Sequence, residues 1–190
     1  MEAVTAFVLA GGKSSRMGRD KALLQFGGKT LLEGALVLAS TVAPKLKIVG
    51  DPAKYAEFGP VVSDIYLDRG PLGGIHAALI NTDTDLNLIL ATDLPFVAPA
   101  FLQHLIATAR STDALVTVPK LGHFFEPLCA IYRKGFSNVA QQALIEGRNK
   151  VDALFTAGIT YLVSEEEIVA AGFSPAMFRN LNTPEDFASL

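Results

Sequence analysis

The feature that most restricts the fold of this chain is a short, almost uninterrupted apolar segment at residues 3–10 that ends directly in two glycines. A run of this length without polar alternation is typical of a strand buried on both faces, as strands of parallel sheets are. A second such run, Leu86–Ala91, ends at Thr92 and Asp93. Segments with helical periodicity separate these runs. The alternation predicts an α/β fold: an open, mostly parallel, doubly wound sheet of the Rossmann-like type with helices on both faces.

The same patterns predict the individual elements. Thr30 is suited to cap a helix whose apolar stripe covers residues 31–42 and ends near Pro44. A helical stretch follows residues 71–74 to about residue 80, and Pro99 suits the first turn of a helix that reaches about residue 110. The other expected elements are strands at 46–49, 61–62, 114–118, 128–132 and 159–163, helices at 136–146 and 151–157, a polar-aromatic loop at 120–126, and two short helices at the C-terminal end. Because ligands bind at the carboxyl ends of strands in such sheets, we expect the site just after residues 10 and 91.

The composition limits the class of protein. Sixteen lysines and arginines against 19 aspartates and glutamates give the 190 residues a formal charge of −3, which argues against a protein that wraps nucleic acid. The single Cys129 excludes an intrachain disulfide or a multi-cysteine metal site. No apolar run approaches the roughly 18 residues that span a bilayer. We therefore expect one cytoplasmic domain, residues 1–190, with no nucleic-acid or membrane partner.

The loop after the first apolar run concentrates positive charge. Four of the 16 basic residues fall between positions 13 and 21, against one acid, Asp20. Paired glycines let backbone N–H groups approach an anion, and Lys and Arg neutralise polyphosphate charge. The spacing is not that of a P-loop, because the glycine required five positions before Gly12 is replaced by Phe7. The pattern favours a specific phosphate site, with a solvated turn carrying incidental charges as the alternative.

Five segments in order along the chain resemble one known family. They read LAGGKSSRMGRDK at 9–21, GPLGG at 70–74, ATDLPF at 91–96, EPL at 126–128 and NLNTPE at 180–185. Together they resemble the MobA-type nucleotidyltransferases, the molybdenum cofactor guanylyltransferases, over nearly the whole chain. The resemblance implies transfer of GMP from GTP to molybdenum-loaded molybdopterin, with Mg²⁺ as cofactor and pyrophosphate as the second product. It also implies possible partners among molybdenum-insertion and molybdoenzyme-maturation proteins.

The resemblance carries roles onto particular residues. It implies catalytic roles for Arg16, Lys21 and Asp93, nucleotide contacts from Leu9, Ala10, Gly11, Gly12, Lys21, Gly50, Asp64 and Asp93, and metal binding by Asp93 and Asn182. Asp93 could instead cap the following turn, Asn182 could form an Asx turn, and Asp64 could be a surface acid. Gly50 departs from the family, which usually carries a nucleotide-contacting Asn there, so that a backbone contact or the neighbouring Asp51 would have to substitute.

Two other functions stay open at this point. A related enzyme could use CTP, with molybdopterin or with a sugar or alcohol phosphate as acceptor, and a protein without catalysis could bind a nucleotide as an adaptor. The second glycine of the Leu9–Gly12 segment favours GTP, because cytidylyl-transferring relatives commonly carry Ala-Ala-Gly there. Among the other polar residues, His76 and His104 lie on helical patterns and are expected to be structural.

Overall fold

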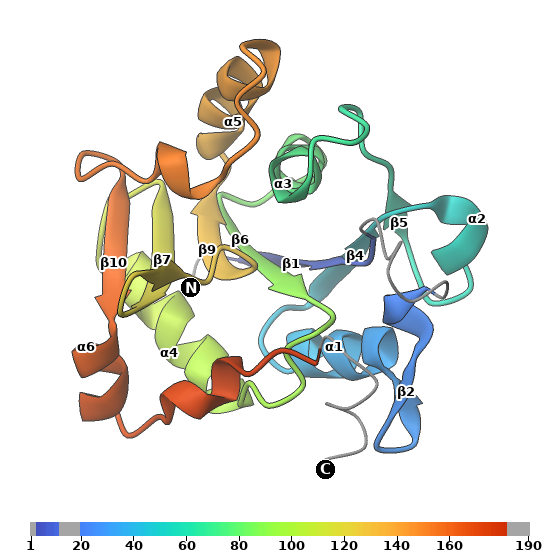
Figure 1. The fold of residues 1–190 in the computed structure, drawn as a ribbon, viewed down its shortest axis with the longest axis horizontal. Helices are drawn as coiled ribbons and strands as arrows, with labels where there is room; N and C mark the ends of the chain where they lie inside the picture. The colour runs from blue at the N-terminus through green and yellow to red at the C-terminus, as the bar shows by residue number, and fades with distance from the viewer. Residues whose placement is uncertain (1–2, 12–19, 182–190) are drawn as a thin grey trace.

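The computed structural model describes residues 3–11 and 20–181, and these form one eight-stranded sheet with helices on both of its faces (Figure 1). The strand order is β10-β7-β9-β6-β1-β4-β5, with β8 paired to β7. Their bounds are β1 Val4–Leu9, β4 Lys45–Val49, β5 Val61–Val62, β6 Leu86–Ala91, β7 Val116–Leu121, β8 Phe124–Phe125, β9 Cys129–Arg133 and β10 Thr160–Ser164. A separate hairpin joins β2 (Gln25–Phe26) to β3 (Lys29–Thr30).

The direction of the strands determines where their ends meet. Strands β6, β1, β4 and β5 run parallel, and β9 is antiparallel to both of its neighbours, β6 and β7. Consequently β7 and its parallel partner β10 have the same direction as β6. Leu9 pairs with Val49 on one side and with Ala91 on the other. The residues that follow these three strands therefore lie next to one another at the carboxyl edge of the sheet.

Helices cover both faces, as the alternation of the sequence predicts. One core cluster combines β1 and β6 side chains with α1 (Leu31–Ser40), α4 (Pro99–Arg110), α6 (Glu165–Ala170) and the 3-10 turn Pro175–Phe178. The opposite cluster contains side chains of α3 (Pro71–Ile80) and α5 (Phe136–Ile145). Figure 1 shows these two groups on opposite sides of the sheet. The predicted doubly wound fold is confirmed.

Local sequence signals explain where the helices begin. Thr30 caps α1 by accepting a hydrogen bond from the Glu33 backbone N–H at 3.1 Å, and the Glu33 carboxylate accepts one in return from the Thr30 N–H at 2.7 Å. Pro99 occupies the first turn of α4. Both features agree with the sequence analysis. None of the described helices is both long and apolar enough to cross a membrane.

The structure corrects the predicted elements in four places. The helix predicted at 151–157 is wrong: only a 3-10 turn, Asp152–Leu154, forms, because Phe155 is extended. The apolar spacing arises because Val151 and Leu154 are buried from a turn rather than from a helix. The loop predicted at 120–126 is partly a hairpin of β7 and β8. The β2–β3 hairpin and α2 (Pro52–Tyr55) were not foreseen; Gly27 and Gly28 adopt φ of 59° and 82°, which suits a tight hairpin turn.

Candidate active site

The expected nucleotide segments meet at the carboxyl edge of the sheet. The Ala10 N–H donates to the Val49 carbonyl oxygen at 2.9 Å, which prolongs the pairing of β1 with β4 beyond the end of β1. The Gly50 N–H donates to the Val62 carbonyl oxygen, also at 2.9 Å. A side-chain atom built at Gly11 would meet nothing within 4 Å among the described residues, so there is open space beside this glycine. Among residues 3–11 and 20–181, the edge therefore leaves the space beside Gly11 open.

An ion pair joins the basic segment, residues 13–21, to the residues that follow β6. The Lys21 Nζ lies 2.7 Å from the Asp93 Oδ2, and the two side chains are 20% and 25% exposed. The two residues are 72 positions apart in the sequence. The Leu181 N–H donates to the Asp93 carbonyl oxygen at 3.2 Å, which places the beginning of the C-terminal NLNTPE segment beside the same residue. Two of the predicted catalytic residues are thus in direct contact.

Glu126 is a third charged group of this region, and the predicted set of site residues omits it. Burial, and to a smaller extent the negative charges of Asp93 and Asp152, together raise its pKa to about 7. Its backbone N–H donates to the Pro119 carbonyl oxygen, which holds the residue at the end of β7. The EPL segment was the signal in the sequence, but it gave no reason to expect an electrostatic link to Asp93. The carboxyl groups of Glu126 and Asp93 therefore lie close enough at this edge of the sheet for their charges to interact.

Asp64 lies two residues beyond β5 and is half-buried. Its Oδ1 is buried and accepts no hydrogen bond from the described part of the chain. Burial raises the pKa of this carboxyl group above its ordinary value. A buried acceptor without a partner is costly, so the geometry fits a carboxyl group that receives N–H or O–H donors from a ligand.

The departure at Gly50 has a steric reason. A Cβ at this position would lie 2.3 Å from the Ala10 carbonyl oxygen and 2.8 Å from the Tyr55 ring. No side chain fits there without movement of backbone, so only the backbone of Gly50 can face a nucleotide. The neighbouring Asp51 is engaged elsewhere: its Oδ1 accepts a hydrogen bond from the Ala53 N–H at 2.9 Å and caps α2. Asp51 is therefore a poor substitute for the family's asparagine.

Three predicted site residues lie outside the described residues. These are Gly12, Arg16 and Asn182. Among the described residues no group of three or more histidines, cysteines, aspartates or glutamates could hold a metal ion by itself. Asp93 can supply one partly exposed carboxylate. One carboxylate fits Mg²⁺, because this ion is usually held by one or two carboxylates together with water and substrate phosphates.

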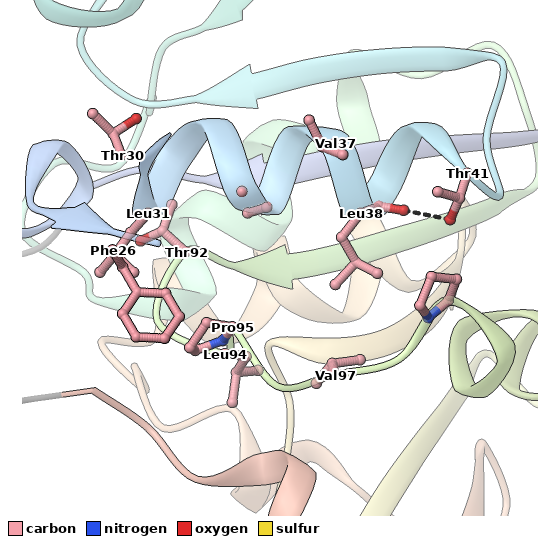
Figure 2. A pocket seen from close by; sticks show the side chains of 13 residues that line it. Phe26, Thr30, Leu31, Val37, Leu38, Thr41, Thr92, Leu94, Pro95 and Val97 are labelled. Atoms are coloured by element: carbon pink, nitrogen blue, oxygen red, sulfur yellow. Dashed lines mark hydrogen bonds between the residues drawn. The ribbon is translucent and has the colours of Figure 1, made fainter. Parts of the chain in front are cut away.

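A cavity of about 290 Å³ lies beside this region, between α1 and the segment that follows β6 (Figure 2). Its described lining residues are apolar or hydroxyl-bearing, including Phe26, Leu38, Thr92 and Pro95, and none of them is charged. Figure 2 shows the aromatic ring of Phe26 near Pro95 at one end of the cavity. A triphosphate needs neutralising charge, so this cavity does not fit the phosphates.

Parallel strands whose ends meet beside a lysine–aspartate pair define the class of protein: a doubly wound α/β protein, a class that binds its ligands at the carboxyl edge of the sheet. Comparison with known proteins identifies the family within that class. Residues 6–158 match the MobA-like NTP transferase domain, and the chain belongs to this family of nucleotidyltransferases. The family is consistent with the use of a divalent metal ion.

Individual relatives agree with this assignment. The chain is 34% identical to the "Molybdenum cofactor guanylyltransferase" of Syntrophotalea carbinolica, covering 96% of this chain and 88% of the relative. It is 33% identical to a "Probable molybdenum cofactor guanylyltransferase" of Pelotomaculum thermopropionicum, with 96% and 89% covered. The crystal structure of molybdopterin-guanine dinucleotide biosynthesis protein A from Archaeoglobus fulgidus superimposes with a TM-score of 0.82 at 27% identity, covering 97% of this chain and 95% of that one. The resemblance inferred from the sequence is confirmed.

Proposed function

We propose that this protein transfers GMP from GTP to molybdenum-loaded molybdopterin, forming the guanine dinucleotide cofactor and pyrophosphate. The observation that carries the proposal is the Lys21–Asp93 pair at the carboxyl edge of the sheet, 2.7 Å apart and partly exposed. The names of the full-length relatives supply the identity of the two substrates. Residues 1–190 would act as one domain in the cytoplasm, without nucleic acid or membrane; molybdenum-insertion and molybdoenzyme-maturation proteins are the proposed partners.

The reaction needs little acid–base chemistry. An oxygen of the molybdopterin phosphate attacks the α-phosphorus of GTP, the new P–O bond forms, and the bond to the β-phosphate oxygen breaks, so that pyrophosphate leaves with the electron pair. The attacking phosphate is already anionic, so no strong general base is required. Catalysis is then a matter of positioning and of charge neutralisation.

The residues of the site divide these tasks. Lys21 and Arg16 neutralise the triphosphate and the departing pyrophosphate, and the backbone of Gly11 and Gly12 approaches the phosphates closely. Leu9 and Ala10 end the strand beneath them, and Gly50 contributes only backbone. Arg16 and Gly12 take these roles by resemblance alone.

A divalent ion would bind at Asp93, with Asn182 as the second protein ligand. We propose Mg²⁺, because a single carboxylate with phosphate oxygens and water is its usual environment. When bound, the ion supplies positive charge to the phosphate oxygens. A cation at Asp93 would also offset the repulsion by which the Asp93 charge helps to raise the pKa of Glu126.

Asp64 is the proposed base-recognition residue. Its buried Oδ1, which has no hydrogen-bond partner among the described residues, can accept a hydrogen bond from the guanine N1–H or 2-amino group, or from a ribose hydroxyl. Adenine carries neither of the two guanine donors, so if Asp64 contacts the base, ATP leaves the acceptor unpaired, at a cost of roughly 1–3 kcal/mol.

Competition among nucleotides tests the proposal. The protein is incubated with loaded molybdopterin, Mg²⁺ and an equimolar mixture of GTP, CTP and ATP, and the products are identified by mass spectrometry. The expected product is the guanine dinucleotide, and the matched variant Asp93→Asn should form much less of it. A cytosine dinucleotide would move the protein to the cytidylyl-transferring branch. Binding of nucleotide without any product would favour the adaptor.

A further inference from the structure

Tyr55 is a buried tyrosine whose hydroxyl reaches the basic segment. It ends α2, is 2% exposed and packs in the core cluster under α1. The Tyr55 hydroxyl donates a hydrogen bond to the Asp20 Oδ2 at 2.7 Å. Burial and the Asp20 charge raise the pKa of the phenol, so that it remains a donor throughout the physiological pH range.

Asp20 is the residue directly before Lys21, and its carboxylate is fully engaged. The Oδ1 accepts a hydrogen bond from the Ala22 N–H at 3.2 Å and caps the 3-10 turn Lys21–Leu23. The Oδ2 accepts from the Tyr55 hydroxyl and also lies 3.3 Å from the Lys54 Nζ. Asp20 therefore fixes the start of the turn from which the Lys21 side chain extends to Asp93.

The glycine at position 50 makes room for this arrangement. A Cβ there would lie 2.8 Å from the Cδ2 and Cε2 atoms of the Tyr55 ring. The ring occupies the space that a side chain at position 50 would need. The absence of a side chain at position 50 and the presence of the Tyr55 ring are therefore coupled. Position 50 offers no side chain to a nucleotide, and the buried Tyr55 hydroxyl instead contacts Asp20.

We propose that Tyr55 is a positioning residue for nucleotidyl transfer: through Asp20 it holds the Lys21 turn so that the lysine ammonium stays at Asp93, where the phosphates bind. The inference rests on the proposed function. Lysine loses side-chain rotamer freedom when it is ordered. A turn that is already fixed at its first residue reduces what must be ordered when the nucleotide binds.

The test is the variant Tyr55→Phe, which keeps the ring and removes the hydroxyl. A lost hydrogen bond to a charged group should lower kcat/KM for GTP about tenfold. The GTP dissociation constant, measured by calorimetry without acceptor, should rise in parallel. The matched control is Tyr161→Phe, which also loses a tyrosine–carboxylate hydrogen bond, to Glu167 at 2.9 Å, but on β10 at the other side of the sheet. Its effect on both quantities should stay below twofold.

A second background separates positioning from a merely structural role. If Tyr55 acts through Lys21, then Tyr55→Phe should have no further effect in a Lys21→Met protein. A fivefold or larger loss that disappears in that background supports the inference, whereas a smaller loss, or one that persists, overturns it. Asp20→Ala removes the same hydrogen bond from the other side and replaces Tyr55→Phe should that variant not fold. A wild-type protein that binds GTP but forms no dinucleotide would refute the proposed function alone. The GTP dissociation constants of Tyr55→Phe, Lys21→Met and the double variant would still decide whether Tyr55 acts through Lys21.

Discussion

Replacement of Lys21 by methionine should change kcat/KM for GTP much more than it changes the free energy of unfolding. At the observed 2.7 Å, two unit charges attract by about 6 kcal/mol at an effective dielectric constant near 20 and by about 1.5 kcal/mol in water. Desolvation of both groups offsets most of this attraction, and the side chains are 20% and 25% exposed. We therefore expect Lys21→Met to cost only about 1 kcal/mol of unfolding free energy.

The effect on catalysis should be larger. Loss of a cation that faces the triphosphate and the leaving pyrophosphate should cost about 2–4 kcal/mol of transition-state stabilisation, or roughly 30- to 1000-fold in kcat/KM for GTP. Pyrophosphate release at varied GTP concentration measures the rate, and urea unfolding measures the stability. Lys134→Met is the matched control, because the Lys134 Nζ donates to the Thr82 carbonyl oxygen at 2.9 Å near the amino end of β6, far from Asp93.

Two outcomes would refute this reasoning. A value of kcat/KM within threefold of the wild type would show that Lys21 serves only its ion pair. A loss of several kcal/mol in unfolding free energy, with activity reduced in proportion to the folded fraction, would assign the lysine to the fold. Lys134→Met should lose a comparable amount of stability and keep its activity, so a joint loss in both variants would also argue against a specific role.

Three further predictions follow from the same structure. Asp93→Asn keeps the shape of the side chain but removes its charge, so the magnesium titration of activity should shift to higher concentration; an unchanged titration would leave Asp93 as a turn cap. Gly50→Ala places a Cβ 2.3 Å from the Ala10 carbonyl oxygen and should lower the free energy of unfolding by about 1–3 kcal/mol, measured by urea; an unchanged midpoint would contradict the packing argument. Burial lowers the pKa of His76, so the unfolded ring takes up a proton near pH 6.5 while the folded ring does so only at lower pH. Stability should therefore fall as the pH drops from about 6.5 through the lowered pKa, and His76→Leu should flatten that part of the urea-midpoint profile.

The sequence predicts the sheet well because buried parallel strands leave a direct trace. Runs such as Leu86–Ala91 are apolar at every position but one, and the exception, Asn87, is itself fully buried. Its side chain joins a buried polar network by accepting from the Thr82 hydroxyl at 2.6 Å. Short segments that form a turn are harder to predict from the sequence than buried strands. The apolar positions 151 and 154 have helical spacing, but a single 3-10 turn satisfies it.

Site residues divide in the same way. Asp93 and Asp64 follow strands, so their place at one edge of the sheet was predictable from strand direction. The role of His76 was predicted as structural, and the ring is buried, but neither nitrogen has a partner among the described residues, which no pattern of spacing could have indicated. Side-chain environments of this kind depend on packing between segments far apart in the sequence.

Gly50 and Tyr55 illustrate why a departure from a family pattern cannot be interpreted one position at a time. From the sequence, Gly50 appears only as a lost contact to the nucleotide. In the structure, the Tyr55 ring occupies the space that a side chain at position 50 would need, and the Tyr55 hydroxyl donates a hydrogen bond to Asp20. Glycine at position 50 removes the asparagine side chain that the family usually carries, and the space is taken by the Tyr55 ring, which carries the hydroxyl bonded to Asp20. Restoring asparagine at position 50 would therefore not restore a nucleotide contact even with a smaller side chain at position 55, because the Cβ would still lie 2.3 Å from the Ala10 carbonyl oxygen.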